Sequence, residues 1–155
     1  MIFAIRQLKA FTLIELILVV VILSVLSTLA VPRLAHFYDT LQLRGFTSDL
    51  SSLAQYLQAE AISRAGVYSL TYDEEHAFFR ARLKVDDEFR DISGRWGRKF
   101  LIPPGITVSG QPPEVSEILF YPDGSSDTAT IYFENKYGAR ISLSIQGSTG
   151  QIKVH

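Results

Sequence analysis

The sequence predicts an α+β protein in which one long N-terminal helix, apolar in its first half and amphipathic in its second, packs on an antiparallel β-sheet. Three observations predict it: an apolar block over residues 11–31, a helical repeat of apolar side chains over 43–65, and short β-rich runs from residue 67 onward. The chain has 155 residues, of which 47% are hydrophobic and 20% charged, which excludes a disordered or collagenous protein.

Charge and cysteine usage exclude further classes of protein. There are 15 basic and 16 acidic side chains, a formal charge of -1, so the whole chain lacks the electrostatic character of a nucleic-acid-binding protein. There is no cysteine, which excludes a disulfide framework, a thiolate metal site and a cysteine nucleophile.

The apolar block over residues 11–31 reads FTLIELILVVVILSVLSTLAV and contains one charge, Glu15. A helix of this length is about 32 Å long, enough to cross the roughly 30 Å hydrocarbon core of a bilayer. Arg6 and Lys9 precede the block without an acidic residue. The positive-inside rule therefore predicts a cytoplasmic N-terminus, with residues 33–155 on the other side of the membrane.

Three interpretations of this block compete. It is a secretory signal peptide cut after Ala30, a plain membrane anchor, or a segment that is cut before the block, between Ala10 and Phe11. Glu15 discriminates among them, because a carboxylate costs about 2.5–3.5 kcal/mol at the bilayer centre and the first two have no use for it. A free amino group at Phe11, on a neighbouring subunit, could pair with it. The alternative is an acid that is favoured by the helix dipole and reaches to the membrane interface.

The sequence FTLIE at residues 11–15, with a short basic leader before it and an apolar run and Pro32 after it, resembles the N-terminus of type IV pilins and type II secretion pseudopilins. The resemblance implies that a prepilin peptidase removes residues 1–10 and N-methylates the new terminal Phe11. It also implies that Glu15 contacts the N-terminus of the adjacent subunit during assembly. Ala10 departs from the family, which nearly always has glycine there; we expect cleavage to survive, at a lower rate.

The second half of the helix is predicted from a stripe of apolar side chains. Pro32 lacks a backbone N–H, so we expect it to kink or interrupt the helix near the membrane exit. The whole helix is expected to run from about Thr12 to Ala65, and Gly66 is a suitable C-terminal stop. Apolar residues at spacings of three and four form a stripe that we assign to the core: Leu43, Phe46, Leu50, Leu53, Leu57, Ala61 and Ala65.

Short β-rich runs separated by turn residues follow the helix, and residues 85–101 are not assigned. Strands of this length suit an antiparallel sheet packed on the helix. The predicted strands are Val67–Tyr72, His76–Lys84, Ile106–Ser109, Ile118–Tyr121, Ala129–Phe133, Ala139–Ile145 and Gln151–Val154.

The C-terminal third carries a second resemblance. The sequence ILFYPDGSS at residues 118–126 looks like the F-x-P-D-G-S segment of H-type minor pseudopilins and related minor pilins, the GspH/FimT-like group. The following strand and the closing residues 145–154 also resemble that group. Major pilins commonly close with a disulfide or calcium-binding loop, and this chain has no cysteine. The resemblances together imply a pilin-like fold.

The expected organisation is a prepilin leader at residues 1–10, a transmembrane and assembly helix at 11–31, an amphipathic helix at 32–66 and a periplasmic β-rich domain at 67–155. The resemblance implies a single-pass protein of the inner membrane that enters a periplasmic filament. Its implied partners are other pseudopilins or pilins, the prepilin peptidase, the inner-membrane assembly platform and membrane lipid.

The implied function is that of a minor pseudopilin, a structural subunit that helps to initiate or cap the type II secretion pseudopilus for protein export across the outer membrane. The alternative is a minor type IV pilin of a pilus or DNA-uptake machine that binds DNA or a surface ligand. The sequence barely distinguishes a subunit of the secretion pseudopilus from one of a pilus or DNA-uptake machine.

No residue pattern points to an enzyme, a cofactor or a small-molecule substrate. The three histidines are scattered without zinc-site spacing, and there is no nucleophile motif. Asp123 and Asp127 are candidate calcium ligands, but Pro-Asp-Gly is explained as a turn. The acidic run at residues 86–88 is expected to be a solvated loop, so we expect no metal site.

One basic stretch is a candidate DNA-binding site. Arg80, Arg82 and Lys84 alternate on one face of a predicted strand and could contact phosphates. Acidic residues at positions 86–91 cancel much of their field, so nucleic acid is not the expected partner. Trp96 is assigned to the core or a subunit interface rather than to base stacking.

Overall fold

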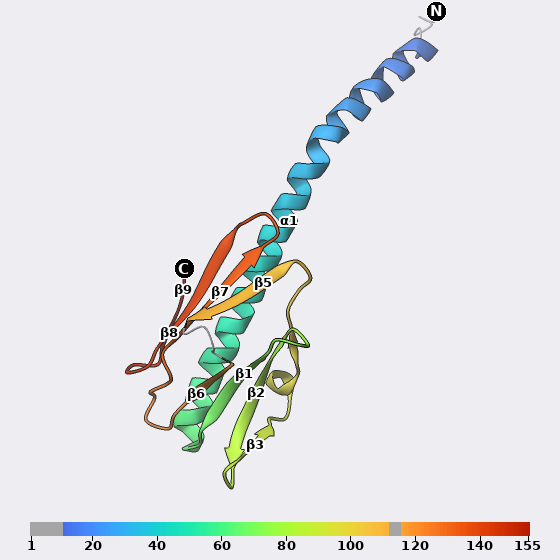
Figure 1. Cartoon of the computed structure of the whole chain (residues 1–155). Coiled ribbons are helices and arrows are strands. Elements are labelled where there is room, and N and C mark those ends of the chain that lie inside the picture. Colours follow the sequence, from blue (N-terminus) through green and yellow to red (C-terminus); the bar gives the residue numbers. More distant parts are fainter. Residues whose placement is uncertain (1–10, 112–115) are drawn as a thin grey trace, which may run out of the picture. The chain divides into compact units, whose positions relative to one another are not determined.

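The computed structural model describes residues 11–111 and 116–155, without the side chains of residues 29–32 and 111. The chain divides into two compact units, Met1–Tyr38 and Asp39–His155. Helix α1, Leu13–Arg64, contributes its first part to one unit and its second part to the other (Figure 1). The predicted helix is confirmed, and it begins and ends within one residue of the expected positions.

The second unit contains two antiparallel sheets, so the predicted α+β class is confirmed, although we expected one sheet. The first has the strand order β3-β2-β1-β6, with β4 also paired to β2, and the second has the order β5-β7-β8-β9. A 3-10 turn, η1, covers Arg95–Gly97. The strands are β1 Tyr68–Asp73, β2 Phe78–Val85, β3 Glu88–Asp91, β4 Phe100–Leu101, β5 Ile106–Gln111, β6 Glu117–Phe120, β7 Ala129–Asn135, β8 Arg140–Gln146 and β9 Gln151–Val154.

All seven predicted strands occur, with ends displaced by up to two residues. The unassigned residues 85–101 hold β3, η1 and β4, which are too short or too exposed to give a strand pattern. The acidic run forms the turn between β2 and β3, where Asp86 and Asp87 both have positive φ and Val85 pairs with Glu88. This is a two-residue hairpin, whose twist matches that of the flanking strands.

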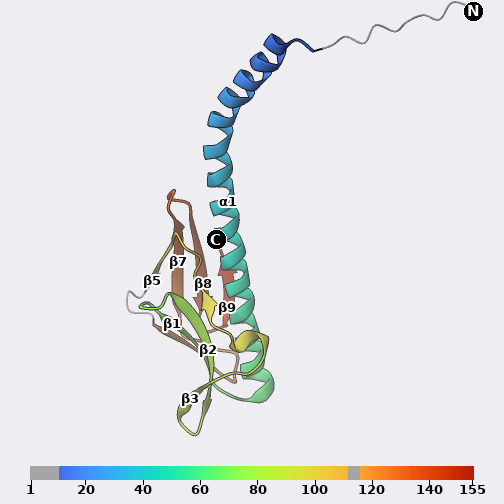
Figure 2. The ribbon, with the colours of Figure 1, turned by 90° about the vertical axis from the view of Figure 1, so that its right-hand side faces the viewer.

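The core forms where the second half of α1 meets both sheets (Figure 2). Six of the seven stripe residues, from Leu43 to Ala61, are buried, and Ala65 is exposed, contrary to the prediction. Phe46 of α1 contacts Phe79 of β2 and Phe133 of β7, with ring centroids 6.3 and 5.5 Å away. The rings of Phe79 and Phe133 lie 6.2 Å apart. One aromatic cluster therefore joins the helix to each sheet.

Helix α1 ends at Arg64, one residue earlier than the end predicted from Gly66. Ala65 has a φ of 49°, in the left-handed region, and the N–H of Gly66 donates to the carbonyl oxygen of Ala61 at 3.2 Å. This six-to-one bond is the mark of a Schellman motif, with Ala65 at the position that usually holds glycine. The Ala65 side chain is exposed because the chain turns away from the helix axis at this residue.

Gln58 ties α1 to two turns that are far away in the sequence. Its amide Nε2 donates to the carbonyl oxygen of Gly124 at 3.0 Å and to that of Thr149 at 3.5 Å. Gly150 has a φ of 61°, and a Cβ there would collide with the Gly124 carbonyl and the Gln58 amide. The close approach of these turns to α1 therefore requires glycine at position 150.

We predict that Ala65→Gly stabilises the fold by about 0.5–1 kcal/mol, because glycine adopts the left-handed conformation without the Cβ strain of alanine. Chemical denaturation of the full chain in detergent micelles measures the free energy of unfolding. The matched control is Ala59→Gly on the exposed face of α1, which should destabilise the protein by about 1 kcal/mol. Equal destabilisation by both substitutions would contradict the assignment of the helix end.

We also predict that Gln58→Ala lowers the free energy of unfolding by about 1–2 kcal/mol, because it leaves two turn carbonyls without their donor. Gln55, one turn before it, is exposed and bonds only to Ser51 within the same helix. Gln55→Ala should therefore change the stability by less than about 0.5 kcal/mol. Similar losses in the two variants would show that Gln58 does not clamp the turns.

Candidate assembly segment

The N-terminal end of α1 carries its own start signal. The Thr12 hydroxyl oxygen accepts the backbone N–H of Glu15 at 3.3 Å, and the Thr12 carbonyl oxygen accepts those of Glu15 and Leu16. Thr12 is thus the N-cap and Glu15 the third helical residue, which is the spacing of a capping box. The side chain of Glu15 lies in the first turn, where a negative charge is favoured by the helix dipole.

From Leu13 to Thr28 the helix exposes apolar side chains all around its axis. Every large hydrophobic residue of this stretch is at least 45% exposed, and Phe11, just before it, is 72% exposed. The hydroxyls of Ser24, Ser27 and Thr28 each donate to a carbonyl oxygen of the same helix at 2.7 Å. These polar groups are satisfied within the helix, so the surface offered to a partner is apolar.

Glu15 is the exception on this surface. Among the described residues its carboxylate has neither a hydrogen-bond nor an ion-pair partner, and it is exposed beside Leu13 and Ile14. The Thr12 hydroxyl engages only the backbone N–H of Glu15. A carboxylate on an otherwise apolar helix surface calls for a cation from outside the chain if that surface is buried.

The other residues predicted for processing and assembly are only partly described. Ala10 lies outside the described residues, and so does the side chain of Pro32, so its expected kink stays a prediction. No single helix in the described part of the chain passes as a membrane span by length and composition. The stretches Leu13–Thr28 and Arg33–Arg64 pass together as a bent pair, on those two criteria alone.

The basic residues weighed for DNA binding lie on β2, as predicted, and each has an acidic neighbour. Arg80 and Arg82 lie 3.6 and 3.7 Å from a carboxylate oxygen of Asp91, and the Lys84 ammonium lies 2.8 Å from Asp87. The hydrogen bond between Lys84 and Asp87 raises the pKa of the lysine and lowers that of the aspartate. These pairs reduce the positive field along β2.

The residues weighed for calcium form a self-contained turn. The carboxylate of Asp123 accepts the backbone N–H of Ser125 at 2.9 Å and its hydroxyl at 2.6 Å, and both bonds lower the pKa of Asp123. Asp127 accepts the Leu119 N–H at 3.0 Å and, at 3.4 Å, the Tyr121 hydroxyl. Within the described part of the chain, no group of three or more metal-ligating side chains could hold an ion.

Trp96 lies where it was expected, against the core. Its ring stacks on Tyr56 of α1 with centroids 5.4 Å apart and an angle of 23° between the planes. The guanidinium of Arg95 lies 5.0 Å from the centroid of the same ring. The 3-10 turn η1 is therefore anchored to the helix through this stacked pair.

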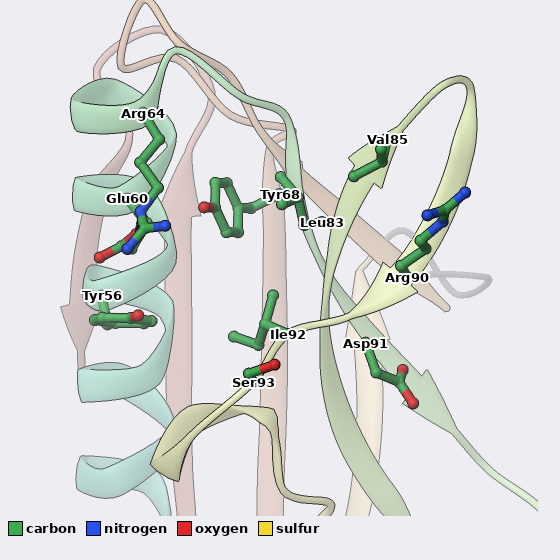
Figure 3. Close-up of a pocket in the computed structure, with 10 residues that line it drawn as sticks. All are labelled: Tyr56, Glu60, Arg64, Tyr68, Leu83, Val85, Arg90, Asp91, Ile92 and Ser93. Atoms are coloured by element: carbon green, nitrogen blue, oxygen red, sulfur yellow. Dashed lines mark ion pairs between the residues drawn. The ribbon is translucent and has the colours of Figure 1, made fainter.

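A pocket of about 380 Å³ beside this pair was missed by the sequence analysis. It lies between the last turns of α1 and strands β1, β2 and β3 (Figure 3). Tyr68, Leu83 and Ile92 provide apolar surface within it, and Glu60 of α1 is ion-paired with Arg64 at one side. Burial raises the pKa of Tyr68, and the nearby Glu60 raises it further. Six of the ten lining residues come from residues 83–93, most of which the sequence left unassigned.

A comparison with protein families finds the prokaryotic N-terminal methylation motif at residues 6–31. No curated protein matches the sequence. Among solved structures, the minor pseudopilin EpsH from the type 2 secretion system of Vibrio cholerae matches with a TM-score of 0.62 and 9% identity, over 73% of this chain and 94% of EpsH. The type IV minor pilin FimU of Pseudomonas aeruginosa matches with a TM-score of 0.59 and 18% identity, over 77% of this chain and 92% of FimU.

At these identities the structural matches are evidence for the fold alone, and the motif is evidence for the N-terminal segment alone. The motif spans Ala10, Phe11 and Glu15, the residues on which the first resemblance was based. The fold shared with EpsH and FimU covers most of the chain, including the β-rich part to which the second resemblance pointed. Both findings agree with the two resemblances: the chain carries the N-terminal methylation motif and has the fold of EpsH and FimU.

Proposed function

We propose that this protein is a minor subunit of a pilin-like filament, and specifically of the type II secretion pseudopilus, in which it helps to initiate or cap the filament for protein export. The observation that carries the proposal is the first part of α1, an apolar surface exposed on all sides with one unpaired carboxylate at its start. The motif at residues 6–31 and the fold shared with EpsH and FimU support it.

In this proposal the apolar helix has two successive environments. Before assembly residues 11–31 cross the inner membrane, with the N-terminus in the cytoplasm and the β-rich domain in the periplasm. Arg6 and Lys9 favour this orientation, since basic residues are retained on the cytoplasmic side. During assembly the same helix leaves the lipid and packs among the helices of other pilins or pseudopilins.

Processing prepares the helix for this transfer. The prepilin peptidase cuts between Ala10 and Phe11 and methylates the new terminal amine. Loss of Arg6 and Lys9 leaves 13 basic and 16 acidic side chains, a formal charge of -3. Cleavage leaves the amine of Phe11 directly before the N-cap Thr12, close to the apolar surface of the helix.

Glu15 then gains a partner that its own chain does not supply. Packing the apolar helix against neighbours would bury the carboxylate at a cost of several kcal/mol unless a cation is adjacent. The terminal amine of a neighbouring Phe11 is such a cation, and it becomes available only after cleavage. The pair would set the axial register of each incoming subunit at the assembly platform.

A minor type IV pilin of a pilus or DNA-uptake machine is the alternative. It shares the N-terminal chemistry and differs in what the exposed domain binds. The acidic partners of Arg80, Arg82 and Lys84 weaken the case for DNA. Salt-sensitive retention of the full chain on DNA, lost when these three residues become alanine, would favour this alternative.

We predict that mass spectrometry of the protein from membranes finds a chain that begins at methylated Phe11. Ala10→Gly, the matched variant, should give the same N-terminus at a higher rate, because glycine is the residue the peptidase usually meets before the cut. A chain beginning at Val31 would identify a secreted soluble domain. A chain beginning at Met1 in the wild type and in Ala10→Gly would identify a plain membrane anchor.

We further predict that both Glu15→Gln and Glu15→Ala are processed but lower filament incorporation by roughly a hundredfold or more. Each variant leaves the terminal amine of a neighbouring Phe11 buried without its carboxylate, and an unpaired buried charge costs about 3–5 kcal/mol. Glutamine separates the two roles of this residue, since it preserves a capping box but carries no charge. The measurement is the ratio of the protein in sheared filaments to that in membranes. Normal incorporation of Glu15→Gln would reduce Glu15 to a helix-capping residue.

A further inference from the structure

We propose that the pocket beside Trp96 and the free edge of the first sheet at β3 and η1 form a docking site for an acidic segment of a partner protein, which inserts one apolar side chain into the pocket. This interaction goes beyond filament assembly through the N-terminal helix. All of its residues belong to the second unit, so it does not depend on the processing of residues 1–10.

The pocket is suited to one side chain of the partner. Its volume of about 380 Å³ lies at the small end of the range for ligand sites. Leu83 and Ile92 are only partly buried, and Tyr56 presents part of its ring on the helix side. Figure 3 shows Tyr68 and Ile92 pointing into the space between α1 and the strands. An apolar or aromatic side chain in this space would cover surface that the chain leaves exposed.

The lining of the pocket holds two cations and two carboxylates, but the segment that carries the neighbouring sheet edge differs in sign of charge from the rest of the chain. Residues 80–99 contain seven basic and four acidic side chains, a formal charge of +3, whereas residues 11–155 as a whole carry -3. The remaining residues therefore carry -6. An asymmetry of this kind steers a partner of opposite charge to one surface.

Four cations of this segment have no carboxylate partner among the described residues. Arg80 and Arg82 share Asp91, and Lys84 pairs with Asp87, which accounts for the other three. Asp91 also lines the pocket, with its carboxylate shared by Arg80 and Arg82, and Arg64 and Arg90 lie on opposite sides of the pocket in Figure 3. The four cations are all exposed, and they are Arg90, Arg95, Arg98 and Lys99.

An acidic protein segment fits this surface better than a nucleic acid. Base stacking needs an aromatic ring with a free face, but Tyr56 and Arg95 already contact the Trp96 ring. Phe78 is 3% exposed and lies under Arg80 and Lys99. A peptide places single carboxylates beside single cations and also brings a side chain for the pocket, which a phosphate backbone does not.

The single tryptophan of the chain reports on this site, because Trp96 stacks on the pocket residue Tyr56. The experiment titrates the purified full chain in detergent micelles and follows its tryptophan fluorescence. The probe is a blocked pentapeptide with phenylalanine at its centre and two aspartates on each side. Two control peptides replace the four aspartates by serine, or the phenylalanine by alanine. A mixed-sequence DNA oligonucleotide, single-stranded and duplex, is the fourth probe.

We expect saturable binding of the acidic phenylalanine peptide that weakens with added salt, and weaker binding of both control peptides. Reversing the charge of Arg90 and Arg98 together, as R90E/R98E, should lower the affinity about tenfold. Ser93→Phe, at an exposed residue of the pocket lining, should block the peptide by filling the space. Lys153→Glu, which reverses a single charge on the other sheet, should leave the affinity unchanged.

Three results would overturn the proposal. The first is no saturable response to the acidic peptide. The second is equal affinity for the serine peptide or for the alanine peptide, because one of the two features would then be irrelevant. The third is tighter binding of the oligonucleotide, which would assign the surface to nucleic acid. The unliganded fluorescence and circular dichroism of each variant verify that it is folded.

Discussion

The contact of Phe46 with Phe79 and Phe133 is the interaction on which the folded unit depends. Each pair of rings lies within the 4.5–7 Å range in which aromatic side chains attract one another, worth about 0.5–1.5 kcal/mol beyond the burial of their surface. Among the described residues the two sheets share no ladder of hydrogen bonds. They meet in this cluster, where Phe46 of α1 reaches a ring in each sheet and the rings of Phe79 and Phe133 also contact each other.

This arrangement explains why a single helix can serve two surfaces. From Leu43 to Ala61 the apolar stripe of α1 is buried against the two sheets. Gln58 ties the last turns of this helix to the turns at Gly124 and Thr149. From Leu13 to Thr28 the helix has no sheet to cover it and no polar face. Its hydroxyls are turned inward to its own carbonyls. The same secondary structure is therefore a core element in one part and an unpartnered apolar surface in the other.

Much of this was readable from the sequence because it depends on local patterns. The period of three and four residues predicted the buried stripe, and β-rich runs between turn residues predicted seven strands. The division into two sheets was not predictable, since strand pairing between β5 and β7 or β1 and β6 joins residues distant in the chain. The helix end was misplaced because Ala65, rather than Gly66, adopts the left-handed conformation, against the usual preference.

The same difference between local patterns and long-range contacts separates the candidate sites that the sequence predicted from the one that it missed. Glu15 stood out because one charge in an apolar block is visible in any window of the sequence, whereas the pocket draws its walls from α1, β1, β2 and β3 and has no local signature. Residues 85–101 gave no pattern for a related reason. Their exposed cations and short strands serve a sheet edge rather than a core, and edge strands are commonly kept charged to prevent unwanted pairing. Protection of an edge accounts for the presence of charge there but not for a positive excess in a chain that is otherwise negative. That excess, beside the pocket, is the feature that the proposed acidic partner would recognise.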